Sequence, residues 1–359
     1  MDAEEQVRYS AELGRFAPAG PPGHGEVERV RDVLVVAGDP GIEQGDASEL
    51  ILLPRWEGGP FDRNGRKDPE PIELGRGLRL EKLDHEEGER VLNACSPRGH
   101  FFVPVRQFGQ MYSLVLDVDP GQLEQGRWTW DTERRIREAV AMSRLVLDNG
   151  YSFEYAARVF DHAGEEQQIM PAGLGQPSTY RVRRTRDWLR DGEADELREL
   201  LVQFWDAHGS LPERVEHALW VAEYVVSVRW LDVIGPLLVV AFEALVNTSR
   251  QLVTRQFEER VPAITEEVEA PLSASLCARM YDARSRWVHG RRVSLYAPPK
   301  AEGEAWEGPT DAEQEAAVER VAKSQDSLRA VLRRCIEDPE FRAIFTDDEA
   351  IKSRWPVTG

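Results

Sequence analysis

The sequence is poor in cysteine, in long apolar runs and in positive charge, and each shortage excludes a class of protein. Its three cysteines, Cys95, Cys277 and Cys335, form no C-x-x-C pair, which argues against a disulfide framework or a zinc ribbon. No apolar run approaches the roughly 20 residues that span a bilayer. The first twenty-odd residues also lack the apolar stretch of a signal peptide. We therefore expect a cytoplasmic protein without a membrane partner.

Motifs for several common chemistries are missing as well. The chain contains no Gly-rich phosphate loop, no H-E-x-x-H and no G-x-S-x-G. His85-Glu86-Glu87 and Asp161-His162 could ligate a metal, but their spacing matches no recurring metal site. We expect neither a metal nor a cofactor.

Charge is unevenly distributed along the chain. Acidic residues outnumber basic ones by 64 to 45, and the net charge of −19 opposes non-specific attraction to nucleic acid. Between Leu276 and Lys300, however, six basic residues accompany the single acid Asp282. This segment is either a solvated helix face that pairs with nearby acids or a phosphate-binding patch. Besides one arginine discussed below, its arginines are Arg279, Arg286, Arg291 and Arg292.

The length of 359 residues favours two domains. Residues 1–24 end in a Pro- and Gly-rich stretch and are predicted to be a disordered lead-in. Residues 25–180 mix strand and helix patterns and predict an α+β domain of unknown role. Residues 181–340 predict an all-α helical bundle, and residues 341–359 a short C-terminal appendage.

Hydrophobic periodicity and turn residues predict the individual elements. Strands are expected near 30–36, 50–53, 101–105, 111–118, 151–160 and 166–170, with a helix over 131–147. Helices follow over 188–208, 212–230, from Asp232 through Leu245, 249–260, 271–289 and 310–336. The tryptophans 220, 230 and 287 lie at helical positions that predict core packing.

The segment most informative about chemistry holds Arg284 five positions before His289. Arginine offers a permanent planar cation that suits phosphate, and histidine a proton that moves near neutral pH. Gly290 directly follows and predicts a helix C-cap. Arg79 and His85 have a similar spacing, but their strand-like, charged surroundings indicate that this pair matches the spacing by chance.

On a helical wheel the segment has two sides. The predicted core stripe consists of Leu276, Met280, Ala283 and Trp287. An outward row consists of Tyr281, Ser285 and His289, with His289 about 150° from the stripe. Arg284 lies on the flank about 140° from His289, so the two side chains converge only through the reach of arginine or fraying of the helix end.

This segment resembles the HEPN superfamily, specifically its ApeA-like branch. Tyr281, Arg284-Ser285 and Val288-His289-Gly290 are similar to that branch's Y-x-x-R-S-x-x-V-H-G signature. Upstream, the helix around Glu243 is similar to an (I/L/F)-E-x-L helix, and Arg260 lies where an arginine often follows. The resemblance covers about 212–336.

The resemblance implies a helical bundle that pairs about a two-fold axis, and in many members a metal-independent endoribonuclease of toxin or antiviral defence systems. It implies that Arg284 and His289 are catalytic, with Tyr281 and Ser285 in support. The local excess of positive charge favours RNA binding by the arginines of the patch. Glu243, on an apolar helix, is a further supporting candidate that either holds an arginine of the bundle or, as its apolar surroundings favour, forms a buried structural ion pair. An antitoxin or a trigger-sensing partner would act through the N-terminal domain. The alternative is a catalytically inactive HEPN module that binds nucleotide, RNA or a partner protein, because Ser285 replaces the Asn, Asp or His of many active relatives outside this branch.

Overall fold

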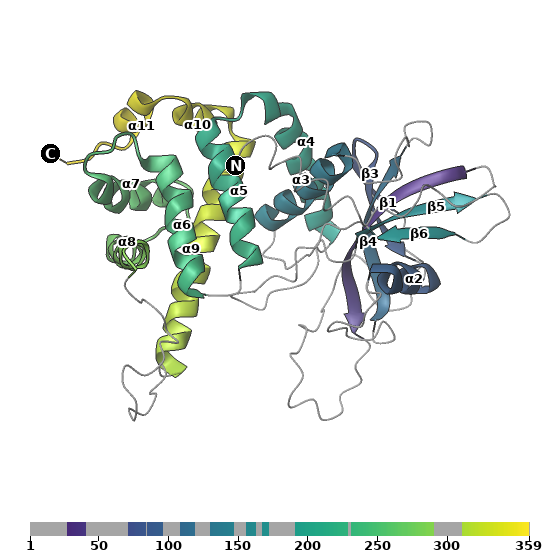
Figure 1. Ribbon diagram of the computed structural model, residues 1–359. Coiled ribbons are helices and arrows are strands. Elements are labelled where there is room, and N and C mark those ends of the chain that lie inside the picture. Colours follow the sequence, from purple (N-terminus) through teal and green to yellow (C-terminus); the bar gives the residue numbers. More distant parts are fainter. Residues whose placement is uncertain are drawn as a thin grey trace, which may run out of the picture.

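The computed structural model describes residues 27–40, 71–83, 85–95, 108–118, 130–146, 156–162, 167–171, 191–228, 231–290 and 311–358. An antiparallel six-stranded sheet with one helix comes first and an all-helical region follows it (Figure 1). This confirms the predicted fold class. The predicted lead-in 1–24 lies outside the described residues, as do Arg291 and Arg292.

The sheet has the strand order β2-β3-β4-β1-β5-β6, and all neighbouring strands are antiparallel. Its strands are β1 Val27–Pro40, β2 Ile72–Gly75, β3 Leu78–Leu83, β4 Phe108–Val118, β5 Ala156–His162 and β6 Gln168–Pro171. Predicted strands near 30–36, 111–118, 151–160 and 166–170 correspond to β1, β4, β5 and β6. Those near 50–53 and 101–105 lie outside the described residues.

Two elements were not predicted, the β2–β3 hairpin and helix α2, His85–Cys95. The hairpin turns through Gly75, Arg76 and Gly77, all with positive φ, at 104°, 50° and 77°. Glycine adopts this conformation without steric cost. Alternating leucines on either side of a Gly-x-Gly turn were the signal that could have identified the hairpin.

Successive residues of β1 serve the two faces of the sheet. Arg31 faces α2, where its Nη1 lies 2.8 Å from Oε1 of Glu87. Asp32 faces the opposite side, lies opposite Arg158 of β5, and accepts two hydrogen bonds from it, at 2.6 and 2.7 Å. A buried bidentate ion pair therefore links the central strand to its neighbour.

The helices lie close to their predicted positions. Their bounds are α3 Trp130–Val146, α4 Asp191–Ala207, α5 Glu213–Ser227, α6 Leu231–Val246, α7 Val253–Glu267, α8 Ala274–Val288, α9 Asp311–Glu337, α10 Pro339–Ala343 and α11 Asp348–Arg354. Short 3-10 turns are η5 His208–Ser210 and η6 Ile344–Thr346. Two expectations were wrong: α6 begins at Leu231, so Asp232 lies inside it rather than capping it, and α7 continues past residue 260 through Pro262.

Helix α3 belongs spatially to the helical region although it lies between β4 and β5 in the sequence. It packs against α4 and α9, and Trp205 of α4 donates a hydrogen bond from Nε1 to the buried carboxylate of Glu138 at 2.8 Å. One apolar cluster runs from Leu74 of β2 through α3 to the C-terminal Trp355. Sheet and helices therefore share a hydrophobic core.

The segment after Asp338 also belongs to that core. Phe341, Phe345 and Trp355 are buried and pack in T-shaped or tilted arrangements, with ring centroids 5.5 to 6.1 Å apart. The expected C-terminal appendage thus packs into the helical bundle through its buried aromatic side chains.

Candidate functional site

Helix α8 carries the predicted site, and both of its ends follow from the sequence. Ser273 caps the N-terminus by accepting a hydrogen bond from the Leu276 amide at 3.2 Å. His289 is the C-cap residue, and its amide donates to the Ser285 carbonyl at 3.1 Å. Gly290 follows with φ +67°, which confirms the predicted glycine that ends the helix.

Arg284 is turned toward helix α6. Its Nη2 lies 3.1 Å from Oε2 of Glu243, and the side chains of the two residues are 28% and 11% exposed. The guanidinium carbon also lies 5.8 Å from the ring centroid of Tyr281. Glu243 was expected to hold an arginine of the bundle, and that arginine is Arg284.

Tyr281 lies on the inner side of α8. Its ring packs against Phe257 of α7 at 5.4 Å, and Phe257 in turn contacts Phe242 of α6. Its predicted place in an outward row with Ser285 and His289 was wrong. Tyr281 and His289 are eight residues apart and therefore point about 80° away from each other around the helix. Helix α7 covers the side on which Tyr281 lies.

His289 is exposed, and Ser285 one turn before it is half-buried. Within the described part of the chain, no hydrogen bond joins His289 to Arg284, which is consistent with the wide angle between them on the wheel. The imidazole is therefore free to meet a substrate or a second protein molecule.

Trp287 departs most clearly from its prediction. It was expected in the core stripe with Leu276, Met280 and Ala283, but its side chain is 44% exposed. Leu276 is buried and Met280 packs against the core, so the stripe is correct for the first half of α8 only. Toward its C-terminal end α8 leaves Trp287 and Val288 uncovered.

The predicted basic patch is partly neutralised. Arg286 forms an i,i+4 ion pair with Asp282 at 2.8 Å, and both side chains are more than half exposed. Arg279 is exposed. Arg286 therefore behaves as a residue of a solvated helix face that pairs with a nearby acid. Arg279 faces solvent, as expected for a residue of a phosphate-binding patch.

The alternative sites in the N-terminal region resolve into ion pairs. Glu87 and Asp161, members of the two metal-ligand candidates, both contact Arg31. Arg79 pairs with Glu81 on its own strand and with Asp117 on the neighbouring β4. Among the described residues, no group of three His, Cys, Asp or Glu side chains could hold a metal ion.

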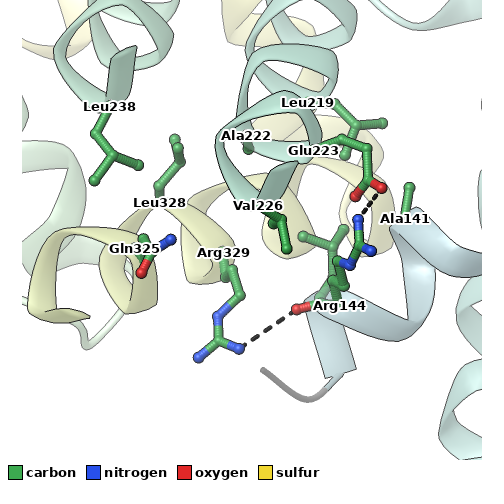
Figure 2. Close-up of a pocket in the computed structure, with 11 residues that line it drawn as sticks. Ala141, Arg144, Leu219, Ala222, Glu223, Val226, Leu238, Gln325, Leu328 and Arg329 are labelled. Carbon is green, nitrogen blue, oxygen red and sulfur yellow. Dashed lines mark hydrogen bonds and ion pairs between the residues drawn. The ribbon is translucent and has the colours of Figure 1, made fainter. Parts of the chain in front are cut away.

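A small hollow opens between α3, α5, α6 and α9 (Figure 2). Its walls are largely apolar and include Leu219, Leu238 and Leu328. The cations at its rim are engaged: Arg144 pairs with Glu223, and Arg329 reaches the Arg144 carbonyl at 3.5 Å. No residue of α8 lines this hollow.

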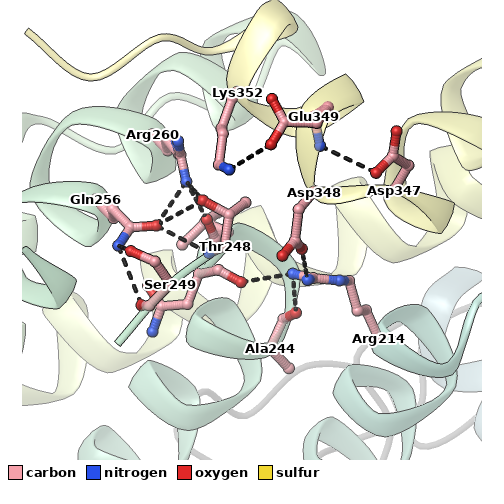
Figure 3. A network of polar contacts seen from close by, with 12 residues as sticks. Arg214, Ala244, Thr248, Ser249, Gln256, Arg260, Asp347, Asp348, Glu349 and Lys352 are labelled. Carbon is pink, nitrogen blue, oxygen red and sulfur yellow. Dashed lines mark hydrogen bonds and ion pairs between the residues drawn. The ribbon is translucent and has the colours of Figure 1, made fainter. Parts of the chain in front are cut away.

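Arg260, the second arginine of the family resemblance, is the centre of a structural network (Figure 3). Its side chain donates to the Val246 carbonyl at 2.6 Å, to Gln256 Oε1 at 2.8 Å and to the Trp355 carbonyl at 2.9 Å. Burial lowers the pKa of its guanidinium, which still remains charged at neutral pH. Arg260 thus joins the end of α6 to α7 and to the C-terminal segment.

The buried cysteines carry no reactivity of their own. Desolvation raises the pKa of the Cys277 thiol to about 12 and raises that of Cys335 as well. A protonated thiol is a poor nucleophile, so neither side chain is a candidate for catalysis.

The described helices include none that is long and apolar enough to cross a membrane. Comparison with known proteins returned no matching family model, no similar curated protein and no similar solved structure.

Proposed function

We propose that this chain is a metal-independent endoribonuclease of HEPN type that acts in the cytoplasm as an effector of bacterial defence. The observation that supports this best is the pairing of Arg284 with Glu243, which fixes a partly exposed guanidinium within two helical turns of the exposed His289. A positioned cation and a free imidazole are the two groups that metal-free RNA cleavage needs.

The reaction proposed is a transesterification within the RNA. The ribose 2′-hydroxyl attacks the adjacent phosphorus while His289 removes the hydroxyl proton. A new P–O2′ bond forms as the P–O5′ bond breaks, and a second histidine protonates the leaving 5′-oxygen. Arg284 binds the non-bridging oxygens and stabilises the charge that grows on them in the transition state. The products are a 2′,3′-cyclic phosphate and a 5′-hydroxyl.

Two-fold pairing is the economical source of the second histidine, because each chain offers one at this site. Within a single chain the two side chains do not converge, because Arg284 points toward α6 and His289 lies at the helix end. A dimer does not require them to converge. A homodimer would place two imidazoles around one phosphate without any change of the Arg284–Glu243 pair.

A catalytically inactive binding module is the second candidate, and one observation favours it. The carboxylate of Glu243 already neutralises Arg284, which reduces the charge that the guanidinium can offer to a phosphate. In that case the helical region would bind RNA, a nucleotide or a protein, and the N-terminal sheet would contact an antitoxin or a trigger-sensing partner.

The test is cleavage of RNA in the presence of EDTA by the full chain and by His289→Ala. We expect loss of cleavage by about a hundredfold or more in the variant, since general acid–base catalysis contributes about 10² to 10⁴. The matched control is His217→Ala, which removes an exposed histidine from α5 and should leave the rate unchanged. Equal rates for His289→Ala and the unsubstituted protein would exclude the nuclease assignment. RNA binding without cleavage by any of the three proteins would favour the inactive module.

A further inference from the structure

Two large apolar side chains are exposed in succession at the end of α8. Trp287 is 44% and Val288 54% exposed, whereas Leu276 and Cys277 near the start of the same helix are buried. Single exposed apolar residues are common on protein surfaces. The Trp287 indole, however, lies within one helical turn of Arg284, the arginine proposed to bind phosphate. Its exposure at this position therefore suggests a role in binding.

Trp287 shares a flank of α8 with Arg284. Residues three apart differ by about 60° on a helix, so the indole follows the guanidinium along the same side, and Val288 continues it. Arg286 precedes Trp287 directly and Arg279 lies about 12 Å back along the axis, and both are exposed. Three arginines of α8, Arg279, Arg284 and Arg286, thus lie within about 12 Å of Trp287 along the helix axis.

We propose that Trp287 is a stacking platform for an unpaired nucleobase next to the phosphate held by Arg284, so that the substrate class is single-stranded or looped RNA. This inference rests on the proposed function of the same site. The indole face can stack on any base, and only an unstacked base can reach it, since A-form duplexes keep their bases inside.

The electrostatics of the chain favour a contact of this kind. With a net charge of −19 the protein repels RNA at long range. Near the site, Asp282 compensates Arg286 and Glu243 compensates Arg284. Affinity must then depend strongly on contacts that salt does not screen, and stacking is one of them.

The competing occupant of this flank is a second copy of the chain. Two copies that share a cleft must meet at His289, which lies about 160° from Trp287 around the helix. That arrangement leaves the Trp287 flank open, whereas a two-fold contact centred on Trp287 would turn His289 away from its symmetry mate. The observations therefore favour RNA on this flank.

The experiment measures binding of a fluorescein-labelled ten-nucleotide RNA, alone and annealed to its complement, by anisotropy in EDTA. The full chain carrying His289→Ala is used so that the probe stays intact. To this background we add Trp287→Phe, which retains an aromatic face, or Trp287→Leu, which retains only apolar bulk. Tyr224→Leu is the control, because it removes another exposed aromatic side chain, on α5.

We expect Trp287→Leu to weaken single-strand binding roughly tenfold and Trp287→Phe about two- to threefold, with Tyr224→Leu unchanged. The duplex should bind at least about tenfold more weakly than the single strand, with no dependence on residue 287. Unchanged single-strand affinity in Trp287→Leu would overturn the inference. So would dissociation of a dimer on sedimentation of Trp287→Leu, which would instead identify a second copy on this flank. Both results leave the nuclease proposal intact, because that proposal depends on the cleavage rate of His289→Ala.

Discussion

The direction of the Arg284 side chain is set by one carboxylate on a neighbouring helix. Glu243 lies on the apolar helix α6, is largely buried, and contacts Arg284 at 3.1 Å. A buried carboxylate is costly unless it is paired, so the pair holds both partners in place. Glu243 is therefore a positioning residue for the proposed reaction, acting through Arg284 rather than on the RNA.

Substitution of Glu243 tests this role. We expect Glu243→Gln to lower kcat/KM for RNA cleavage about tenfold and Glu243→Ala about a hundredfold, because a misplaced guanidinium stabilises the transition state less well. Glu243→Asp should restore part of the loss. The measurement is initial-rate cleavage kinetics together with the thermal midpoint of each variant.

Glu223→Gln is the matched control, since Glu223 forms a largely buried ion pair with Arg144, their side chains being 17% and 9% exposed. Both Gln variants should lose a similar amount of stability, about 1–3 kcal/mol, but only Glu243→Gln should lose activity. Equal activity losses in the two would show that Glu243 acts through stability alone.

At the scale of elements, one buried charge pair joins the central strand to β5. Asp32 and Arg158 have side chains that are 0% and 2% exposed, and desolvation raises the pKa of Asp32 above its usual value. Thr132 at the start of α3 donates a further hydrogen bond to Asp32. The pair thus fixes the register of β1 against β5 and the position of α3 over the sheet.

We expect Asp32→Asn to destabilise the protein by about 3–5 kcal/mol, because it leaves the Arg158 cation buried without a counter-charge. The double variant Asp32→Leu with Arg158→Met should recover most of this loss, since apolar side chains of similar volume often replace a buried ion pair at little cost. Urea denaturation of the three proteins measures the difference. A double variant no more stable than Asp32→Asn would show that the pair contributes more than charge compensation.

For the whole molecule, the proposed chemistry requires two copies of the chain. Each chain supplies one imidazole at the site, and this imidazole is exposed rather than bound to its own Arg284. The shared core of sheet and helices gives each copy a rigid frame on which such a pairing can form.

Cleavage should therefore rise faster than linearly with protein concentration in the range where dimers form, approaching the square of the concentration well below the dimer dissociation constant. Initial rates across a dilution series, with light scattering at the same concentrations, provide the measurement. A strictly linear rate from a protein that is monomeric throughout would contradict a shared cleft.

Elements that depend on local sequence pattern could be predicted without the structure. Helical periodicity located most of α3 to α9 within a few residues, although α7 ends at Glu267 rather than near residue 260. Gly290 ends α8 as predicted, whereas the start was predicted at Pro271 and the structure places it at Ala274, with Ser273 as the cap. The exposure of His289 also followed from the wheel. The β2–β3 hairpin was missed although its leucines alternate with polar residues, because β2 and β3 are only four and six residues long and so short a pattern is a weak signal.

Which side of α8 is covered depends on how its neighbouring helices pack against it. A helical wheel describes one helix in isolation, and it cannot show that α7 covers Tyr281 while leaving Trp287 in solvent. It likewise cannot choose the partner of Glu243, because that contact joins residues 41 positions apart through the packing of α6 against α8. Contacts between elements distant in sequence depend on how whole helices pack, and this is why the polar partner and the exposed aromatic face of the site emerged only with the fold.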